Sequence, residues 1–189
     1  MKIGLMFANS GPMSDPTLFA HLVKTAESCG IESIWTVEHV VIPRDYKSVY
    51  PYSSSGKIPG KENVPIPDPL LHLAFAASIT GKLKLGTGVL ILPQRHPLYT
   101  AKEVASLDVL SNGRALLGIG SGWLKEEFDL LGLGWNDRGP ASIVSTWPPV
   151  MWASSAPWAV VGDGKSGVSP NRSAAAKRPA SRPMAADST

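Results

Sequence analysis

A glutamate and a histidine, Glu38 and His39, come directly after an apolar run of strand length at residues 31–37. In parallel α/β folds the carboxyl ends of strands collect catalytic side chains. An imidazole in such a place can hold a hydrogen bond to a bound ring or move a proton near neutral pH. A histidine that only closes the end of the strand is the simpler interpretation, and spacing alone favours it.

A second candidate site is the glycine-rich turn at residues 118–122, which follows another apolar run and precedes a short predicted helix. Glycines let backbone N–H groups approach an anion, and a helix N-terminus adds a favourable dipole. The turn is therefore a weak candidate for an anion-binding site. The turn matches a nucleotide-binding fingerprint only in part.

The sequence gives little support for a metal site or for disulfide chemistry. The four histidines, His21, His39, His72 and His96, lack the spacing of metal ligands, so we expect no metal site. The single cysteine, Cys29, permits no disulfide within the chain and is predicted to be a small buried apolar residue.

Four apolar runs of strand length lie in the first 139 residues, and a helix-like segment follows each. Continuous apolar runs are typical of parallel strands that are covered on both faces. Four successive βα units therefore predict a parallel α/β sheet. The long segment 42–67 comes after the second strand, so it is a candidate lid over a ligand as well as a plain loop. The four runs are residues 2–8, 31–37, 84–92 and 114–119.

The helices are predicted from their capping signals. Two of them begin with an aspartate and a proline, Asp15-Pro16 and Asp68-Pro69, which is the pattern of a side-chain cap before the first helical residue. Gly30 and Gly81 end these two helices. The other two are predicted at residues 97–110 and 125–131.

Charge is distributed unevenly along the chain. The 189 residues carry a net charge of +3, but residues 1–139 hold 13 basic and 13 acidic side chains, so the excess lies in residues 140–189. Because no basic face with interleaved aromatic residues occurs before that point, no nucleic-acid partner is expected. The apolar runs are too short for a bilayer span or a secretory leader, which predicts a cytoplasmic protein without a membrane partner.

Composition changes abruptly after Gly139. The first 139 residues contain 19 leucines and 7 glutamates, and residues 140–189 contain neither. Alanine, serine and proline make up 26 of these last 50 residues, so we predict an irregular, disordered, low-complexity tail. Since the change interrupts a βα series, we also hypothesise that residues 140–189 are frameshifted or chimeric. The predicted domains are therefore 1–139 and 140–189.

Residues 1–139 resemble the luciferase-like monooxygenase superfamily, and within it the oxidoreductases that use the deazaflavin coenzyme F420. The resemblance implies the N-terminal half of a (β/α)8 TIM barrel, about four βα units, with a cofactor at the carboxyl ends of the strands. Five motifs in order carry it: Ile34-Trp35-Thr36-Val37-Glu38-His39, Leu85-Gly86-Thr87-Gly88-Val89, Arg95-His96-Pro97, Asp108-Val109-Leu110-Ser111-Asn112-Gly113-Arg114 and Leu117-Gly118-Ile119-Gly120-Ser121-Gly122-Trp123.

The resemblance also implies roles for particular residues. It makes His39 the first catalytic candidate, with Glu38 as its neighbour. It implies that Gly88 and Val89 form a non-prolyl cis peptide behind the flavin or deazaflavin ring, where the residues alone indicate only a bulge or a close backbone approach. It assigns the 118–122 turn, through Gly120, Ser121 and Gly122, to the phosphate or side chain of the cofactor.

The implied function is hydride transfer between coenzyme F420 and a small-molecule substrate, with FMN-dependent monooxygenation as the alternative. A hypothesis of another class is a catalytically inactive half-barrel remnant, because the resemblance covers only four of eight units. A half-barrel leaves strand edges unpaired, and these edges can pair with strands of other chains. We therefore expect a homo-oligomer or an aggregate.

Overall fold

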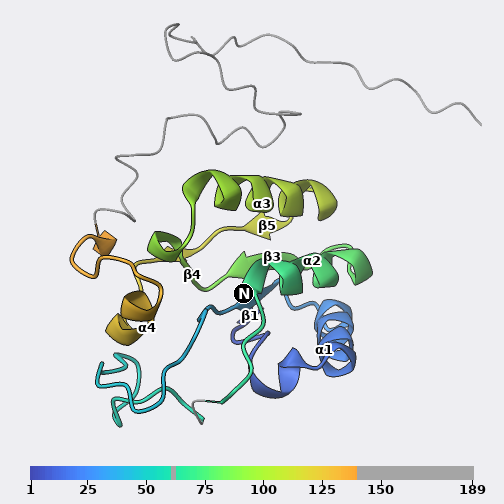
Figure 1. The fold of residues 1–189 in the computed structure, drawn as a ribbon. Helices are drawn as coiled ribbons and strands as arrows, with labels where there is room; N and C mark the ends of the chain where they lie inside the picture. The colour runs from blue at the N-terminus through green and yellow to red at the C-terminus, as the bar shows by residue number, and fades with distance from the viewer. Residues whose placement is uncertain (61–62, 140–189) are drawn as a thin grey trace, which may run out of the picture. The chain divides into compact units, whose positions relative to one another are not determined.

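The computed structural model describes residues 1–60 and 63–139. The predicted tail at 140–189, with its proposed frameshift, lies outside these residues. The fold is α/β, as predicted, and is built on a parallel sheet whose strand order β1-β2-β3-β5 follows the chain (Figure 1). The four strands of this sheet are β1 (Gly4–Leu5), β2 (Ser33–Thr36), β3 (Lys84–Thr87) and β5 (Ala115–Leu116).

Two of the predicted strands continue as short second segments. β4 (Leu90–Ile91) and β6 (Ile119–Gly120) pair in parallel with each other beyond the ends of β3 and β5. The run 84–92 is therefore two strands rather than one, and the Gly88–Val89 peptide bond between them is cis.

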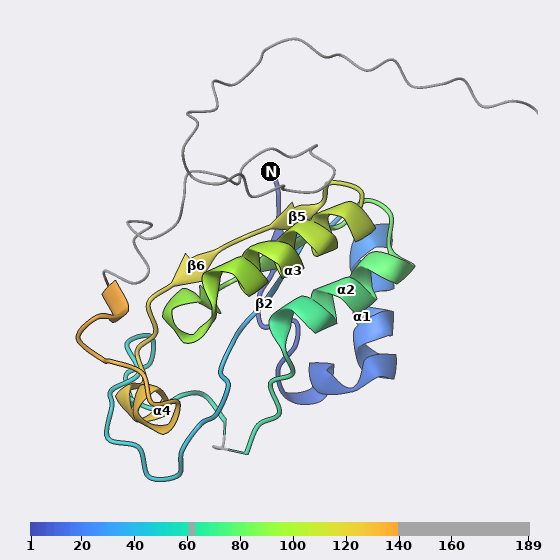
Figure 2. The ribbon, with the colours of Figure 1, turned by 45° about the horizontal axis from the view of Figure 1, so that its top comes forward.

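Three helices cover one face of the sheet (Figure 2). They are α1 (Pro16–Ser28), α2 (Pro69–Ile79) and α3 (Pro97–Leu110), and each connects one strand to the next. Ile34 and Leu85 on the strands pack against Phe19 of α1, Leu73 of α2 and Leu107 of α3 to form the core. This burial of apolar surface is the main force that holds the layers together.

The predicted helix caps are present. The Asp15 carboxylate accepts hydrogen bonds from the backbone N–H groups of Thr17 and Leu18, both at 2.9 Å. Asp68 does the same for the first turn of α2. The remaining helical elements are η1 (Gly11–Ser14), η2 (Leu92–Gln94) and α4 (Lys125–Leu130).

Cys29 is exposed, so the prediction that it is buried was wrong. The helix α1 buries Phe19, Val23 and Ala26, but it ends at Ser28, and the chain then turns away through Gly30 at a φ of 74°. Within residues 1–60 and 63–139, no helix has the length and apolar character needed to cross a membrane.

Trp35 lies on the face of the sheet opposite the helices. A Cβ on Gly86 would overlap the Trp35 ring, and a Cβ on Gly4 would lie 2.9 Å from its Nε1. The indole therefore lies over glycines on both neighbouring strands. Its Nε1–H donates to the Ser33 hydroxyl at 3.0 Å.

Candidate functional site

The three segments singled out in the sequence meet at the carboxyl ends of the strands. The N–H of Gly88 donates to the carbonyl of Thr36, at the end of β2, over 2.7 Å. The Thr87 hydroxyl donates to the Gly118 carbonyl at 2.8 Å, and the Gly118 N–H donates back to the hydroxyl at 3.0 Å. The chain beyond β2, the Gly88–Val89 bond and the 118–122 turn are thus tied to one another.

His39 lies after β2 and is engaged at both ring nitrogens. Its Nδ1 is 2.9 Å from Oε2 of Glu127, and its Nε2 accepts a hydrogen bond from Trp123 Nε1 at 3.2 Å. Only 8% of the His39 side chain is exposed. The Trp123 ring also meets the His39 ring edge-on, with 5.6 Å between centroids.

Glu127, on α4, is a buried partner of His39 that sequence reasoning missed. Its Oε1 accepts the backbone N–H groups of Val40 at 2.6 Å and Val41 at 3.1 Å. Burial acts to raise the pKa of Glu127, but His39, the Gln94 amide and the Val41 N–H outweigh burial and hold that pKa below its usual value. Glu127 is therefore a carboxylate at neutral pH, and it fixes both His39 and the backbone that follows.

Glu38 points to a different set of partners. Its carboxylate accepts the Ile91 N–H at 2.5 Å and Arg95 Nε at 2.7 Å, and Arg95 also pairs with Asp68 at 2.5 Å. Burial raises the pKa of Glu38, although Arg95 opposes this shift. In the described residues no hydrogen bond joins Glu38 to His39, so the structure does not bring the predicted pair together. The catalytic role of Glu38 stays a prediction.

The peptide bond between Gly88 and Val89 is cis, as the resemblance implied. Met6 lies against it, since a Cβ on Gly88 would be 3.0 Å from Met6 Cε. Met6 and Val89 are 50% and 41% exposed, so an apolar surface adjoins this bond. A flat aromatic ring fits such a surface, and the predicted contact of Gly88 and Val89 with a cofactor stays a prediction.

Contacts within the protein are enough to explain why glycines occupy the 118–122 turn. A Cβ on Gly120 would lie 2.6 Å from Val89 Cγ2, and one on Gly122 would lie 2.7 Å from Phe128 Cε2. The helix α4 begins only at Lys125 and carries two glutamates in its first turn, which disfavours an anion there. Cofactor binding by Gly120, Ser121 and Gly122 is therefore still a prediction.

The segment 42–67 is held on α4 and on Trp123 (Figures 1 and 2). Glu126 accepts the N–H groups of Lys47 at 2.7 Å and Ser48 at 3.1 Å, and it accepts the Ser48 hydroxyl at 2.6 Å. Burial opposes ionisation, but these donors lower the pKa of Glu126 to about 2. The Trp123 ring meets the rings of Tyr46 and Tyr50, with centroids 5.5 and 5.0 Å away.

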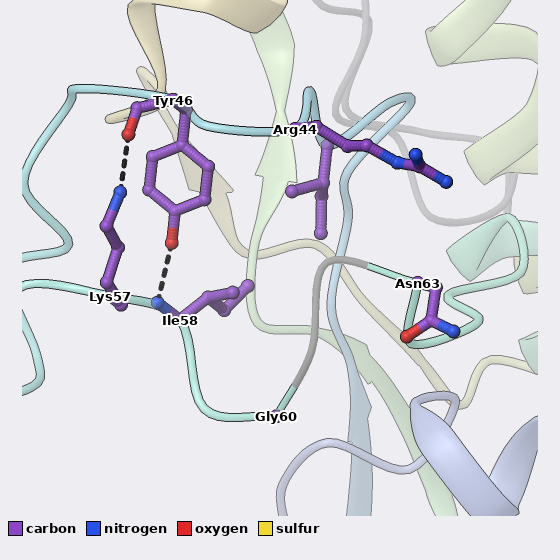
Figure 3. A pocket seen from close by; sticks show the side chains of 7 residues that line it. Arg44, Tyr46, Lys57, Ile58, Gly60 and Asn63 are labelled. Carbon is purple, nitrogen blue, oxygen red and sulfur yellow. Dashed lines mark hydrogen bonds between the residues drawn. The ribbon is translucent and has the colours of Figure 1, made fainter.

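The same segment forms a pocket of about 690 Å³ (Figure 3). The Tyr46 hydroxyl accepts the Ile58 N–H at 2.8 Å, and Lys57 lies over the Tyr46 ring while its ammonium donates to the Tyr46 carbonyl. A smaller cavity of about 110 Å³ is lined by His39, and Ile42 borders both cavities. The lining of the larger pocket includes Ile42, Arg44, Tyr46, Lys57, Ile58 and Asn63. Both apolar and basic side chains thus line this pocket.

Comparison with known proteins identifies the family. A family model described as luciferase-like monooxygenase matches residues 2–141. The chain belongs to the luciferase-like monooxygenase family. In this family fold the described residues supply the N-terminal part of a TIM barrel, as the motifs predicted. In residues 1–60 and 63–139 of this luciferase-like chain, no group of three or more histidine, cysteine or acidic side chains is placed to hold a metal ion.

Several characterised proteins are similar to this luciferase-like chain. The 5,10-methylenetetrahydromethanopterin reductase of Methanopyrus kandleri is 35% identical in an alignment 153 residues long, which covers 75% of this chain and 37% of the reductase. The solved structure of the coenzyme F420 dependent tetrahydromethanopterin reductase from that organism is 34% identical and covers 71% of this chain and 30% of its own, with a TM-score of 0.49.

A monooxygenase is among the similar structures as well. The oxygenating constituent of 3,6-diketocamphane monooxygenase from Pseudomonas putida, in complex with FMN, is 28% identical with a TM-score of 0.52. The match covers 76% of this chain and 37% of the monooxygenase. This luciferase-like chain thus spans less than half the length of the relatives that it matches.

Proposed function

We propose that this chain forms the N-terminal part of the active site of an F420-dependent oxidoreductase, which transfers a hydride to or from a small-molecule substrate. The observation that carries the proposal is the exposed apolar surface of Met6 and Val89 beside Gly88, at the carboxyl ends of the strands. The 35% identity to a methanopterin reductase supports the choice of F420. When bound, the deazaflavin would supply the carbon that gives or accepts the hydride.

The residues present fit a ring cofactor at this edge. Met6 and Val89 offer an apolar surface for the flat ring. Because Gly88 has no side chain, Met6 can lie close to the backbone at this point. His39 would orient a ligand or move a proton at its ring nitrogen. The segment 42–67, held by Glu126, contributes Ile42, Val64 and Ile66 to the lining of the smaller cavity beside His39 and would help to exclude water from a bound substrate.

A second candidate function is FMN-dependent monooxygenation. The 28% identity to a monooxygenase that binds FMN favours it, and the surface beside Val89 suits either ring. In both cases the substrate would enter the pocket formed by segment 42–67.

A titration of the whole chain with each oxidised cofactor tests the proposal. We expect tight binding of F420, followed by its visible absorbance, and weaker binding of FMN. Val89→Asp should weaken F420 binding by at least about tenfold, because it places a charge against an apolar ring. Val109→Asp, at a position on α3 that is 80% exposed, should leave binding unchanged. Tight binding of FMN alone would favour monooxygenation, and binding of neither cofactor would support an inactive remnant.

We further propose that the chain forms homo-oligomers. Apolar side chains lie exposed on α2 and α3, including Leu71, Phe75, Leu98 and Leu110. Apolar patches of this kind favour association. Sedimentation of the chain at micromolar concentration should show a dimer or larger species, and a single monomer boundary would contradict this. The expected cytoplasmic location and the absence of nucleic-acid and membrane partners stay predictions.

A further inference from the structure

The hydrogen bonds around His39 determine which ring nitrogen carries the proton. An indole N–H can only donate, so Nε2 of His39, which is 3.2 Å from Trp123 Nε1, must act as the acceptor. In the neutral ring the proton then lies on Nδ1, which donates to the Glu127 carboxylate at 2.9 Å. Each partner by itself indicates this tautomer, and the two agree.

We propose that Glu127 and Trp123 are positioning residues that hold His39 as its Nδ1–H tautomer and keep the Nε2 lone pair for an incoming hydrogen-bond donor. Glu127 is itself fixed, because it is buried and its other oxygen accepts the N–H groups of Val40 and Val41. The carboxylate therefore does not need to reorganise when a ligand arrives.

Trp123 links this tautomer to segment 42–67. Its ring is held edge-on by Tyr46 and Tyr50, so the position of the indole N–H depends on that segment. A ligand that reaches Nε2 must displace the indole N–H. To replace the lost bond it must offer an N–H or O–H group, while a carboxylate or phosphate oxygen at this point would leave Nε2 without a donor. This inference does not depend on which cofactor the chain binds.

His72 supplies an internal reference with the opposite tautomer. Its Nε2 lies 2.9 Å from the carbonyl oxygen of Met13, and a carbonyl can only accept. The proton of the neutral His72 ring therefore lies on Nε2. Nuclear magnetic resonance should show two histidines of opposite tautomer in one protein.

The test is a pair of two-bond ¹⁵N–¹H correlation spectra of the full, ¹⁵N-labelled chain and its variants, recorded at about pH 8, above the ordinary imidazole pKa. A His39→Gln variant assigns the His39 signals. We expect the Nδ1–H pattern for His39 and the Nε2–H pattern for His72. Glu127→Gln should remove the preference of His39 for Nδ1–H, while Asp129→Asn, on the same helix, should leave it unchanged.

Trp123→Phe keeps an aromatic ring but removes the indole donor. It should shift the His39 Nε2 resonance and retain the Nδ1–H pattern that Glu127 maintains. Retention of the wild-type dispersion of the backbone amide resonances shows that each variant is folded. The proposal is overturned if wild-type His39 shows the Nε2–H pattern, if folded Glu127→Gln keeps the full Nδ1–H preference, or if Trp123→Phe leaves the Nε2 resonance where it was. If a variant does not fold, the wild-type spectrum still tests whether the His39 proton lies on Nδ1.

Discussion

At the scale of single residues, Trp35 determines which glycines the sheet needs. Its indole lies over Gly86, where an added Cβ would overlap the ring. Gly86→Ala should therefore lower the free energy of unfolding by about 1–3 kcal/mol, the usual cost of overpacking a tight site. Urea denaturation measures the change.

A matched glycine checks this explanation. Gly81, between α2 and β3, has no atom within 4 Å of an added Cβ. Gly81→Ala should change stability by less than about 0.5 kcal/mol, as exposed substitutions usually do. Equal losses in the two variants would show that Trp35 is not the cause.

The candidate site could be predicted from the sequence only in part. His39 follows an apolar strand, and its place at the strand end was visible from that pattern together with the motifs. Its partner Glu127 lies 88 residues away along the chain, and one of two adjacent glutamates in a short helix gives no sign of such a contact. The Glu38 side chain also leaves the site, because neighbouring residues of an extended chain point to opposite sides.

At the scale of secondary structure, two aspartates perform the same task in different surroundings. Asp15 caps α1 and is exposed, whereas Asp68 caps α2 and also pairs with Arg95. Asp15→Ala should cost about 1 kcal/mol, the usual value of a helix cap. Asp68→Ala should cost about 2–3 kcal/mol, because it also removes a partner of a half-buried guanidinium. Thermal or urea unfolding measures both.

A double variant separates the two contributions of Asp68. In an Arg95→Met background the ion pair is already absent, so Asp68→Ala should cost no more than Asp15→Ala does. If Asp68→Ala still lowers the free energy of unfolding by more than Asp15→Ala in the Arg95→Met background, the additional loss does not come from the ion pair with Arg95.

Helices were easier to predict than strands in this chain. Capping aspartates and prolines are local signals, and the bounds 97–110 agree with α3. Strand lengths depend on pairing with distant residues, so the run 2–8 has only Gly4–Leu5 paired as β1. The run 84–92 is divided at Gly88–Val89, and the apolar pattern alone could not reveal this break.

At the scale of the whole molecule, stability should depend on pH through Glu126. Its pKa in the folded chain is about 2, below its ordinary value of 4.5. A lowered carboxyl pKa stabilises the fold above the ordinary value, and this contribution is lost as the pH falls toward the folded pKa. Wild type should therefore exceed Glu126→Gln in stability by about 1 kcal/mol near neutral pH, and the difference should shrink between about pH 5 and pH 2.

The control for this pH series is Asp129→Asn on the same helix. The Asp129 carboxylate pairs with Lys125 four residues earlier, and both side chains are about half exposed. Removing this pair should cost only a few tenths of a kcal/mol. A Glu126→Gln difference that stays constant from neutral to acid pH would contradict the role assigned to the Glu126 carboxylate.

The attachment of segment 42–67 to α4 has a consequence for how new specificities arise. Glu126 and Glu127 bind the chain after β2 mainly through backbone N–H groups, at Val40, Val41, Lys47 and Ser48. Every amino acid except proline offers that N–H, so the anchor places little restriction on side-chain identity. Pocket-lining residues that lie between these points, such as Ile42 and Arg44, can thus be exchanged, by evolution or by grafting, while the backbone that positions them remains the same.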